Sequence, residues 1–227
     1  MRFGFLRHAV QLLLLSAVLG VAENVMAQKE GEGAQSGKTN DGTLFLGPIF
    51  NGGQNFHTGT LASGWKSSAR FAWSAGADAH YLITDGLGLD MQVVYDVRGL
   101  YLYDSLRNST NSKLNYLSLR PELNFGSFLL GLGIGIPLGS SSEIGSALTT
   151  QETTGDGSGM NLMLEVRVGL SIPVMESDFG LLKINLGGSY CFTRISNSVV
   201  WSDPTINNGP LASIGIGVVY LFNFGQM

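Results

Sequence analysis

Side chains across residues 67–224 alternate between an apolar set and a small or polar set, in one strand-like run after another. Charged side chains within these runs fall on the polar set. In residues 87–103, for example, the face opposite the apolar residues carries Asp90, Asp96 and Arg98. A period of two residues indicates a β-strand whose two faces meet different surroundings.

The length of the runs and the scarcity of charge indicate what those surroundings are. The run over residues 67–83 is far longer than the roughly five or six residues of an ordinary globular strand, whereas a tilted membrane-crossing strand needs about 9–11 residues plus its ends. Charged residues make up 13% of the chain, against roughly 25% in soluble domains. The apolar face is therefore predicted to contact lipid.

The N-terminus has the pattern of an exported protein. Arg2 and Arg7 precede an apolar stretch over residues 9–22, and small or tolerated residues lead up to Ala27. This pattern predicts a signal peptide over residues 1–27, cleaved near Ala27. The alternative is a transmembrane anchor, but the stretch falls short of about 20 residues. Export combined with lipid-facing strands predicts the bacterial outer membrane of a Gram-negative cell.

Residues 28–42 are rich in Gly, Ser, Lys and Glu, and they predict a flexible periplasmic leader. Residues 43–227 form a single predicted domain. Its eight expected strands cover approximately residues 43–56, 67–83, 87–103, 114–125, 128–138, 160–173, 181–193 and 211–224.

The connections between these strands alternate in length. The short ones are residues 84–86, 126–127 and 173–180, and the long ones are residues 57–66, 104–113, 139–159 and 194–210. Outer-membrane barrels have short periplasmic turns and long external loops, and an even strand number leaves both chain ends in the periplasm. The sequence thus predicts an all-β, eight-stranded antiparallel up-and-down transmembrane β-barrel.

Ten charged residues and one histidine fall on the face predicted to point into the lumen. They are Arg70, Asp78, His80, Asp90, Asp96, Arg98, Arg120, Glu122, Glu165, Arg167 and Lys183. A closed barrel of eight strands has an interior that side chains can fill, so these groups must neutralise one another. We predict a polar, filled lumen with a structural charge cluster.

The tight turns suggest how the strands pair. If Ile83 pairs with Leu87, His80 faces Asp90 across the hairpin. If Phe125 pairs with Phe128, Arg120 and Glu122 face glycines at positions 133 and 131, whose missing side chains leave space for the long side chains opposite.

Catalytic and metal sites are not predicted. His80 and Asp90 could form two of the three members of a nucleophilic triad, and Ser74 or Ser68 lies on the same predicted face. Because no sequence signature marks the nucleophile, a structural histidine held by a carboxylate is favoured. His57 lies at a predicted external loop and by itself does not define a hydrolase. The mature chain has two histidines and one cysteine without metal-ligand spacing, and no cofactor is predicted.

The charge of the chain argues against a nucleic-acid partner. The full sequence has a formal net charge of −4. Removing residues 1–27 takes away Arg2, Arg7 and Glu23, which makes the mature chain one charge more negative. Nucleic-acid binding domains carry a basic surface instead.

Three segments carry a resemblance to a known family: Gly47–Asn55, Tyr116–Leu123 and Gly215–Phe222. With them the chain resembles the bacterial outer-membrane β-barrel domain family that includes the PorT-like proteins, and more distantly the small OmpX and OmpA-type barrels. The resemblance implies the barrel fold and an outer-membrane location. Its PorT-like branch implies a component of a protein secretion apparatus.

We therefore expect a non-enzymatic integral barrel with an envelope-structural or loop-mediated surface-binding role. The alternatives are a secretion component, which needs a protein partner at the periplasmic turns or at residues 28–42, and an outer-membrane lipid-modifying enzyme. A diffusion pore conflicts with a filled lumen. At the level of the fold, the alternative is a soluble barrel with its faces inverted. Membrane lipid is the expected surrounding, and the oligomeric state stays open.

Overall fold

The computed structural model describes residues 42–59, 61, 63–146, 149–177, 179–194 and 210–226. The predicted signal peptide (residues 1–27), nearly all of the predicted leader (residues 28–42) and most of the predicted loop 194–210 lie outside these residues. Within the described part of the chain, no helix is long and apolar enough to cross a membrane.

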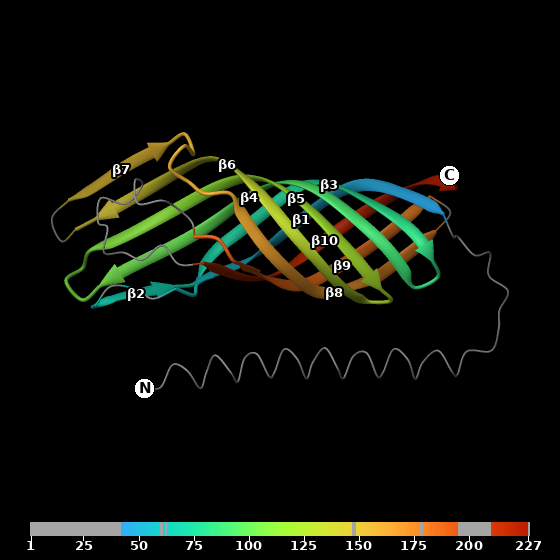
Figure 1. Cartoon of the computed structure of the whole chain (residues 1–227), viewed down its shortest axis with the longest axis horizontal. Coiled ribbons are helices and arrows are strands. Elements are labelled where there is room, and N and C mark those ends of the chain that lie inside the picture. Colours follow the sequence, from blue (N-terminus) through green and yellow to red (C-terminus); the bar gives the residue numbers. More distant parts are fainter. Residues whose placement is uncertain are drawn as a thin grey trace, which may run out of the picture.

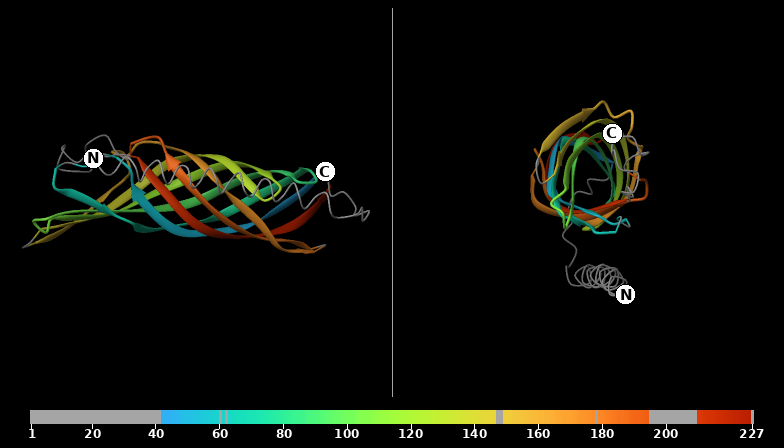
Figure 2. Two further views of the ribbon diagram at one scale, coloured as in Figure 1. Left: turned by 90° about the horizontal axis from the view of Figure 1, so that it is seen from below. Right: turned by 90° about the vertical axis from the view of Figure 1, so that its left-hand side faces the viewer.

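The described residues form antiparallel strands, and eight of these strands close into a ring. The ring order is β1, β3, β4, β5, β6, β8, β9 and β10, with β10 returning to pair with β1. Viewed along its axis the ring is closed (Figure 2). The strands are β1 (Thr43–His57), β2 (Trp65–Ser68), β3 (Arg70–Thr84), β4 (Leu87–Asp104), β5 (Ser109–Phe125), β6 (Phe128–Gly145), β7 (Thr150–Gly155), β8 (Met163–Ser177), β9 (Gly180–Cys191) and β10 (Leu211–Gln226).

The two ends of the barrel differ. At one end, on the right in Figure 1, β1 starts beside the end of β10, because Thr43 pairs with Gln226. The connections β3–β4 and β5–β6, each two residues long, lie at this turn end. At the other, loop end, β2 pairs with β4, and β7 pairs with β6 beyond the ring. We call β2, β7 and the loop-end parts of β4, β5 and β6 the extension.

The extension is the main departure from the predicted strands. The predicted loop 139–159 contains the end of β6 and all of β7, and the predicted loop 104–113 shrinks because β5 starts at Ser109. These segments are rich in Ser, Thr and Asn, so backbone pairing holds them without an apolar face to mark them.

In the β4–β5 turn, Asn108 and the backbone N–H of Leu106 donate to Asp104, which holds the pKa of this carboxyl below its ordinary value.

Two smaller corrections concern turns. The predicted turn 173–180 is shorter, because β8 continues to Ser177 and a register shift between Pro173 and Met175 accommodates the proline. The predicted pair Ile83–Leu87 is wrong, since Leu87 pairs with Thr84 across a register shift.

The predicted register otherwise holds at both tight hairpins. His80 pairs with Asp90 between β3 and β4. Phe125 pairs with Phe128 and Glu122 with Gly131 between β5 and β6. The two-residue turns therefore set the pairing that the sequence indicated.

Burial across the barrel wall is inverted relative to a soluble protein. Large apolar side chains such as Leu132 (59% exposed) and Ile216 (52% exposed) lie on the outside. Arg120 and Glu165, at 2% and 1% exposed, lie inside. The soluble barrel with inverted faces is therefore wrong. We call the outer apolar surface the belt.

The sequence predicted a lumen that is polar throughout, but part of the interior is apolar. Toward the loop end, buried apolar side chains pack together inside: Leu100, Leu102, Leu114, Tyr116, Met160, Met163, Cys191 and Leu211. A second group lies nearer the turn end: Phe45, Ile49, Val94, Leu181, Val219 and Leu221. Both ends of the polar interior are thus filled by apolar packing as well as by charge.

The belt predicts a strong penalty for charge on its surface. We expect Leu132→Arg to lower the free energy of unfolding in lipid vesicles by about 2–4 kcal/mol, or to block assembly, because the new charge has no partner in the membrane. Leu106→Arg is the matched control, since Leu106 is 74% exposed but lies in the β4–β5 turn beyond the belt. Equal penalties for the two substitutions would contradict a lipid-facing belt.

Candidate functional site: the charged lumen

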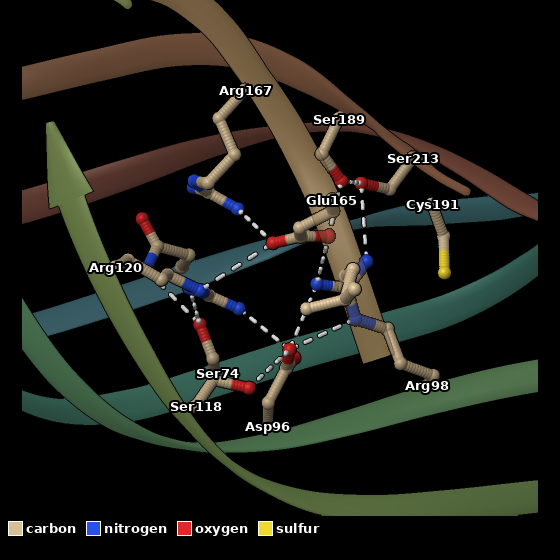
Figure 3. A network of polar contacts seen from close by, with 12 residues as sticks. Ser74, Asp96, Arg98, Ser118, Arg120, Glu165, Arg167, Ser189, Cys191 and Ser213 are labelled. Carbon is tan, nitrogen blue, oxygen red and sulfur yellow. Dashed lines mark hydrogen bonds and ion pairs between the residues drawn. The ribbon is translucent and has the colours of Figure 1, made fainter. Parts of the chain in front are cut away.

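Asp96 is the centre of the larger of two polar clusters in the lumen. It accepts hydrogen bonds from Arg98, 2.8 Å from Nη2 and 2.9 Å from Nε, and from Arg120, 2.6 Å from Nη2. The Ser118 hydroxyl is a further donor at 3.4 Å. Figure 3 shows these side chains converging from neighbouring strands.

Glu165 on β8 carries the cluster across the lumen to the opposite wall. It accepts from Arg98 at 3.0 Å, from Arg167 at 3.0 Å and from the Ser189 hydroxyl at 2.8 Å. Since β4 and β8 are not neighbours in the ring, the Arg98–Glu165 ion pair ties two separate parts of the wall together.

Glu122 completes the cluster and shows why the facing strand carries glycine. It accepts from Arg167 Nε at 2.5 Å and from Gln92 Nε2 at 2.7 Å. A Cβ atom on Gly131 would lie 2.5 Å from Glu122 Cγ, so Gly131 leaves the space that Glu122 fills. At Gly133 the space is used by the strand on the other side, because a Cβ there would lie 2.5 Å from Cγ of Glu165, which pairs with Gly133 from β8.

The smaller cluster lies nearer the turn end around Asp90. His80 Nδ1 lies 2.5 Å from Asp90 Oδ1, and Asn124 donates to the second oxygen. Lys183 Nζ, on β9, lies 3.2 Å from both Asp90 oxygens. This lysine also joins non-neighbouring strands through the lumen.

Asp78 differs from the other buried carboxylates in its hydrogen bonding. It is 1% exposed, and neither of its side-chain oxygens has a hydrogen-bond partner among the described residues. A buried carboxylate without donors contributes desolvation cost without the compensating bonds that Asp96 receives.

Arg70 is the one residue predicted for the lumen cluster that lies outside it. The pairs Ser68–Tyr101 and Trp73–Val97 are separated by five residues on the β2–β3 side and by four on β4. The extra residue reverses the alternation near Ala69, so both Arg70 and the following residue face outward.

The other ten predicted residues face the lumen. They comprise four basic groups, five acidic groups and His80. Ser74 contacts Arg120 and Asn51, and Ser68 is exposed, so neither contacts His80 as a triad would require. Within the described residues, no group of three or more His, Cys, Asp or Glu side chains is arranged to hold a metal ion.

A row of glycines that the sequence analysis did not predict lines the lumen beside the larger cluster. Gly53, Gly215, Gly187 and Gly169 pair in succession across β1, β10, β9 and β8. A Cβ atom on Gly53 would lie 2.2 Å from the backbone oxygen of Ile214, so the strands approach too closely there for any side chain. The sequence could have indicated this row, because these glycines fall on the face of each strand that is predicted to point into the lumen.

The glycine row borders a cavity of about 80 Å³. Arg98, Arg120 and Arg167 line its other side. A cavity of this volume holds only a few waters. This small space therefore lies between the glycine row and the arginine side chains of the larger cluster.

Comparison with known proteins gives only remote likenesses. No protein-family model and no curated protein sequence matches the chain. Among solved structures it is similar to the attachment invasion locus protein Ail of Yersinia pestis, with a TM-score of 0.41 and 12% identity over 80% of this chain and 99% of that one. It is also similar to Neisserial surface protein A (TM-score 0.37, 14% identity, 78% and 95% covered) and to the outer membrane protein OprG of Pseudomonas aeruginosa (TM-score 0.38, 12% identity, 82% and 97% covered).

The PorT-like branch of the sequence resemblance stays a prediction.

The two kinds of buried carboxylate predict opposite responses to one chemical change. Asp96→Asn removes a charge that two arginines need, so we expect the free energy of unfolding to fall by about 3–5 kcal/mol. Asp78→Asn removes a charge without hydrogen-bond partners, so stability should change by less than about 1 kcal/mol or rise. Urea unfolding in detergent micelles measures both, and a larger loss for Asp78→Asn than for Asp96→Asn would contradict the assigned contacts.

Proposed function

We propose that this chain is a non-enzymatic integral protein of the bacterial outer membrane, whose lumen is closed and whose extension faces the cell exterior. In this proposal the protein has an envelope-structural or surface-binding role. The signal-peptide pattern at residues 1–27 supports export.

The observation that carries the proposal is the inverted burial of the ring. Apolar side chains cover the outside of every ring strand, and the buried charges pair inside. Such a surface is stable only against lipid, because a contiguous apolar surface of this extent does not occur on soluble monomers. A closed β-barrel also satisfies all its backbone groups within the membrane.

The closed lumen favours a role on the outer surface over one in conduction. Ion pairs such as Arg98–Glu165 and Lys183–Asp90 cross the interior, and apolar side chains pack toward both ends. The extension is then the largest protein surface offered to the exterior. The turn end offers less, since three of its connections (β3–β4, β5–β6 and β8–β9) are two residues long.

A secretion component of the PorT-like kind is the second candidate. The three sequence segments Gly47–Asn55, Tyr116–Leu123 and Gly215–Phe222 support it. Crosslinking in intact cells from the turn end would recover a secretion partner if this candidate holds.

The closed lumen predicts the behaviour of the purified protein in a planar bilayer. We expect no large, steady, porin-like conductance, because no continuous aqueous path crosses the ion pairs. Arg120→Ala or Glu122→Ala should permit small, flickering currents, since an unpaired buried charge recruits water. A steady wide-pore conductance of the unaltered protein would overturn the closed-lumen proposal.

The extension should be separable from the barrel. Ser140 and Gly155 pair directly, so replacing residues 141–154 by Asn-Gly would close the β6–β7 hairpin with a two-residue turn. We expect this variant to keep the heat-dependent gel mobility of a folded barrel. Attachment and self-aggregation of cells bearing it should fall at equal surface level. Unchanged attachment would argue against a binding role for this hairpin.

A further inference from the structure

We propose that a groove on the outer wall, where the start of β3 meets the extension, binds the anionic sugar head group of an outer-leaflet glycolipid through Arg70. This inference rests on the proposed outer-membrane location and adds a ligand to it. The groove is separate from the charged lumen, from which the barrel wall divides it.

The extra residue near Ala69 places Arg70 on this wall. The Arg70 guanidinium carbon lies 5.3 Å from the centre of the Tyr101 ring, and Nε donates to Asn111 Oδ1 at 3.1 Å. A Cβ atom on Gly99 would lie 2.7 Å from Arg70 Cγ, so glycine at this position lets the arginine lie against the wall. Two contacts and the space left by Gly99 thus hold this exposed arginine against the wall.

The fixed guanidinium leaves its terminal nitrogens available. Neither has a hydrogen-bond or ion-pair partner among the described residues, and Arg70 is exposed. Two parallel N–H groups in one plane match a phosphate or carboxylate bidentately. An arginine held by its inner nitrogen and by an aromatic ring is therefore preorganised for an anion.

Around Arg70 an open groove of about 460 Å³ offers partners for hydroxyl groups. Ser109, Asn111, Glu143 and Thr150 line it together with Tyr101. Asn111 Nδ2 lies 3.5 Å from Glu143 Oε2, so an amide and a carboxylate stand side by side as donor and acceptor. Hydroxyl, amide and carboxylate groups beside an aromatic ring suit a sugar, which has both polar edges and an apolar face.

Charge near the groove favours a ligand with phosphate or carboxylate groups. Lys113 pairs with Gly99 and Lys66 with Tyr103, and both lysines are exposed on the wall that carries Arg70. Glu143 and its cross-strand partner Glu152 are the acidic groups on the far side of the groove. An anionic ligand would therefore bind over Arg70 and Lys113, with its hydroxyls toward Glu143.

The position relative to the belt identifies a lipid as the source of the sugar. Phe71 follows Arg70 directly and is 65% exposed, so acyl chains that cover Phe71 bring their head group to the groove. The Tyr101 and Tyr103 rings stack at 5.7 Å on the same strand, a position typical of the membrane interface. A soluble sugar would gain nothing from this adjacency.

The test is native mass spectrometry of the full chain in detergent micelles. The first probe is a bis-phosphorylated, acylated glucosamine disaccharide, and the second is the same glycolipid without phosphates. We expect Arg70→Gln to weaken binding of the first probe about tenfold, because charge-assisted hydrogen bonds to the phosphate are lost. Lys113→Gln, which leaves the extra residue near Ala69 untouched, should also weaken binding of the first probe.

Arg107→Gln is the matched control, because Arg107 is exposed at the tip of the β4–β5 turn, outside the groove. It should bind the first probe as the unaltered protein does, and the second probe should bind all variants alike. Equal binding of the first probe to the unaltered protein, Arg70→Gln and Lys113→Gln would overturn the inference. So would a water-soluble glucosamine bisphosphate that binds as tightly as the glycolipid.

The same samples separate this inference from the proposed function. Heat-dependent gel mobility and insertion into lipid vesicles test the membrane barrel without the groove. A protein that passes both but shows no dependence on Arg70 or Lys113 refutes the groove alone, whereas failure of both refutes the membrane barrel.

Discussion

Mutual neutralisation of charges inside a closed ring is the constraint on which the rest of this structure depends. Arg120 and Glu165 are almost fully buried, and an unpaired charge in such a place would cost several kcal/mol. Ion pairs across the lumen, such as Arg98–Glu165, therefore need the ring to be closed at the observed stagger. Because the polar faces point into the lumen, the apolar face of every strand points outward. An apolar surface of this extent is stable only in contact with lipid.

Alternation along single strands made much of this fold predictable from the sequence. Period-two patterning located the ring strands, and two-residue turns set pairs such as His80–Asp90 and Glu122–Gly131. The extension was missed, because strands that meet water on their outer face need no apolar phase. Arg70 was misplaced, since a single inserted residue reverses the alternation and leaves no mark in composition.

The partners of the lumen charges could not be read from the sequence for a different reason. The contact between Lys183 and Asp90 joins strands that do not pair, so it depends on the closure of the ring and not on any local pattern. The same holds for the glycine row across β1, β10, β9 and β8, which appears only when four strands are in register. Local residue patterns therefore predict each strand, whereas the contacts between lumen side chains depend on how the ring closes.

The central claim is that the exposed apolar face contacts lipid, and collision accessibility of spin labels tests it most directly. Labels at Leu119, Ile134 and Ile216, introduced as cysteines in a Cys191→Ser background, lie on the belt, and a label at Leu106 lies beyond it. In lipid vesicles the three belt labels should collide readily with oxygen and hardly with a water-soluble nickel chelate, whereas Leu106 should show the reverse. Ready access of the nickel chelate to the belt labels would contradict the account.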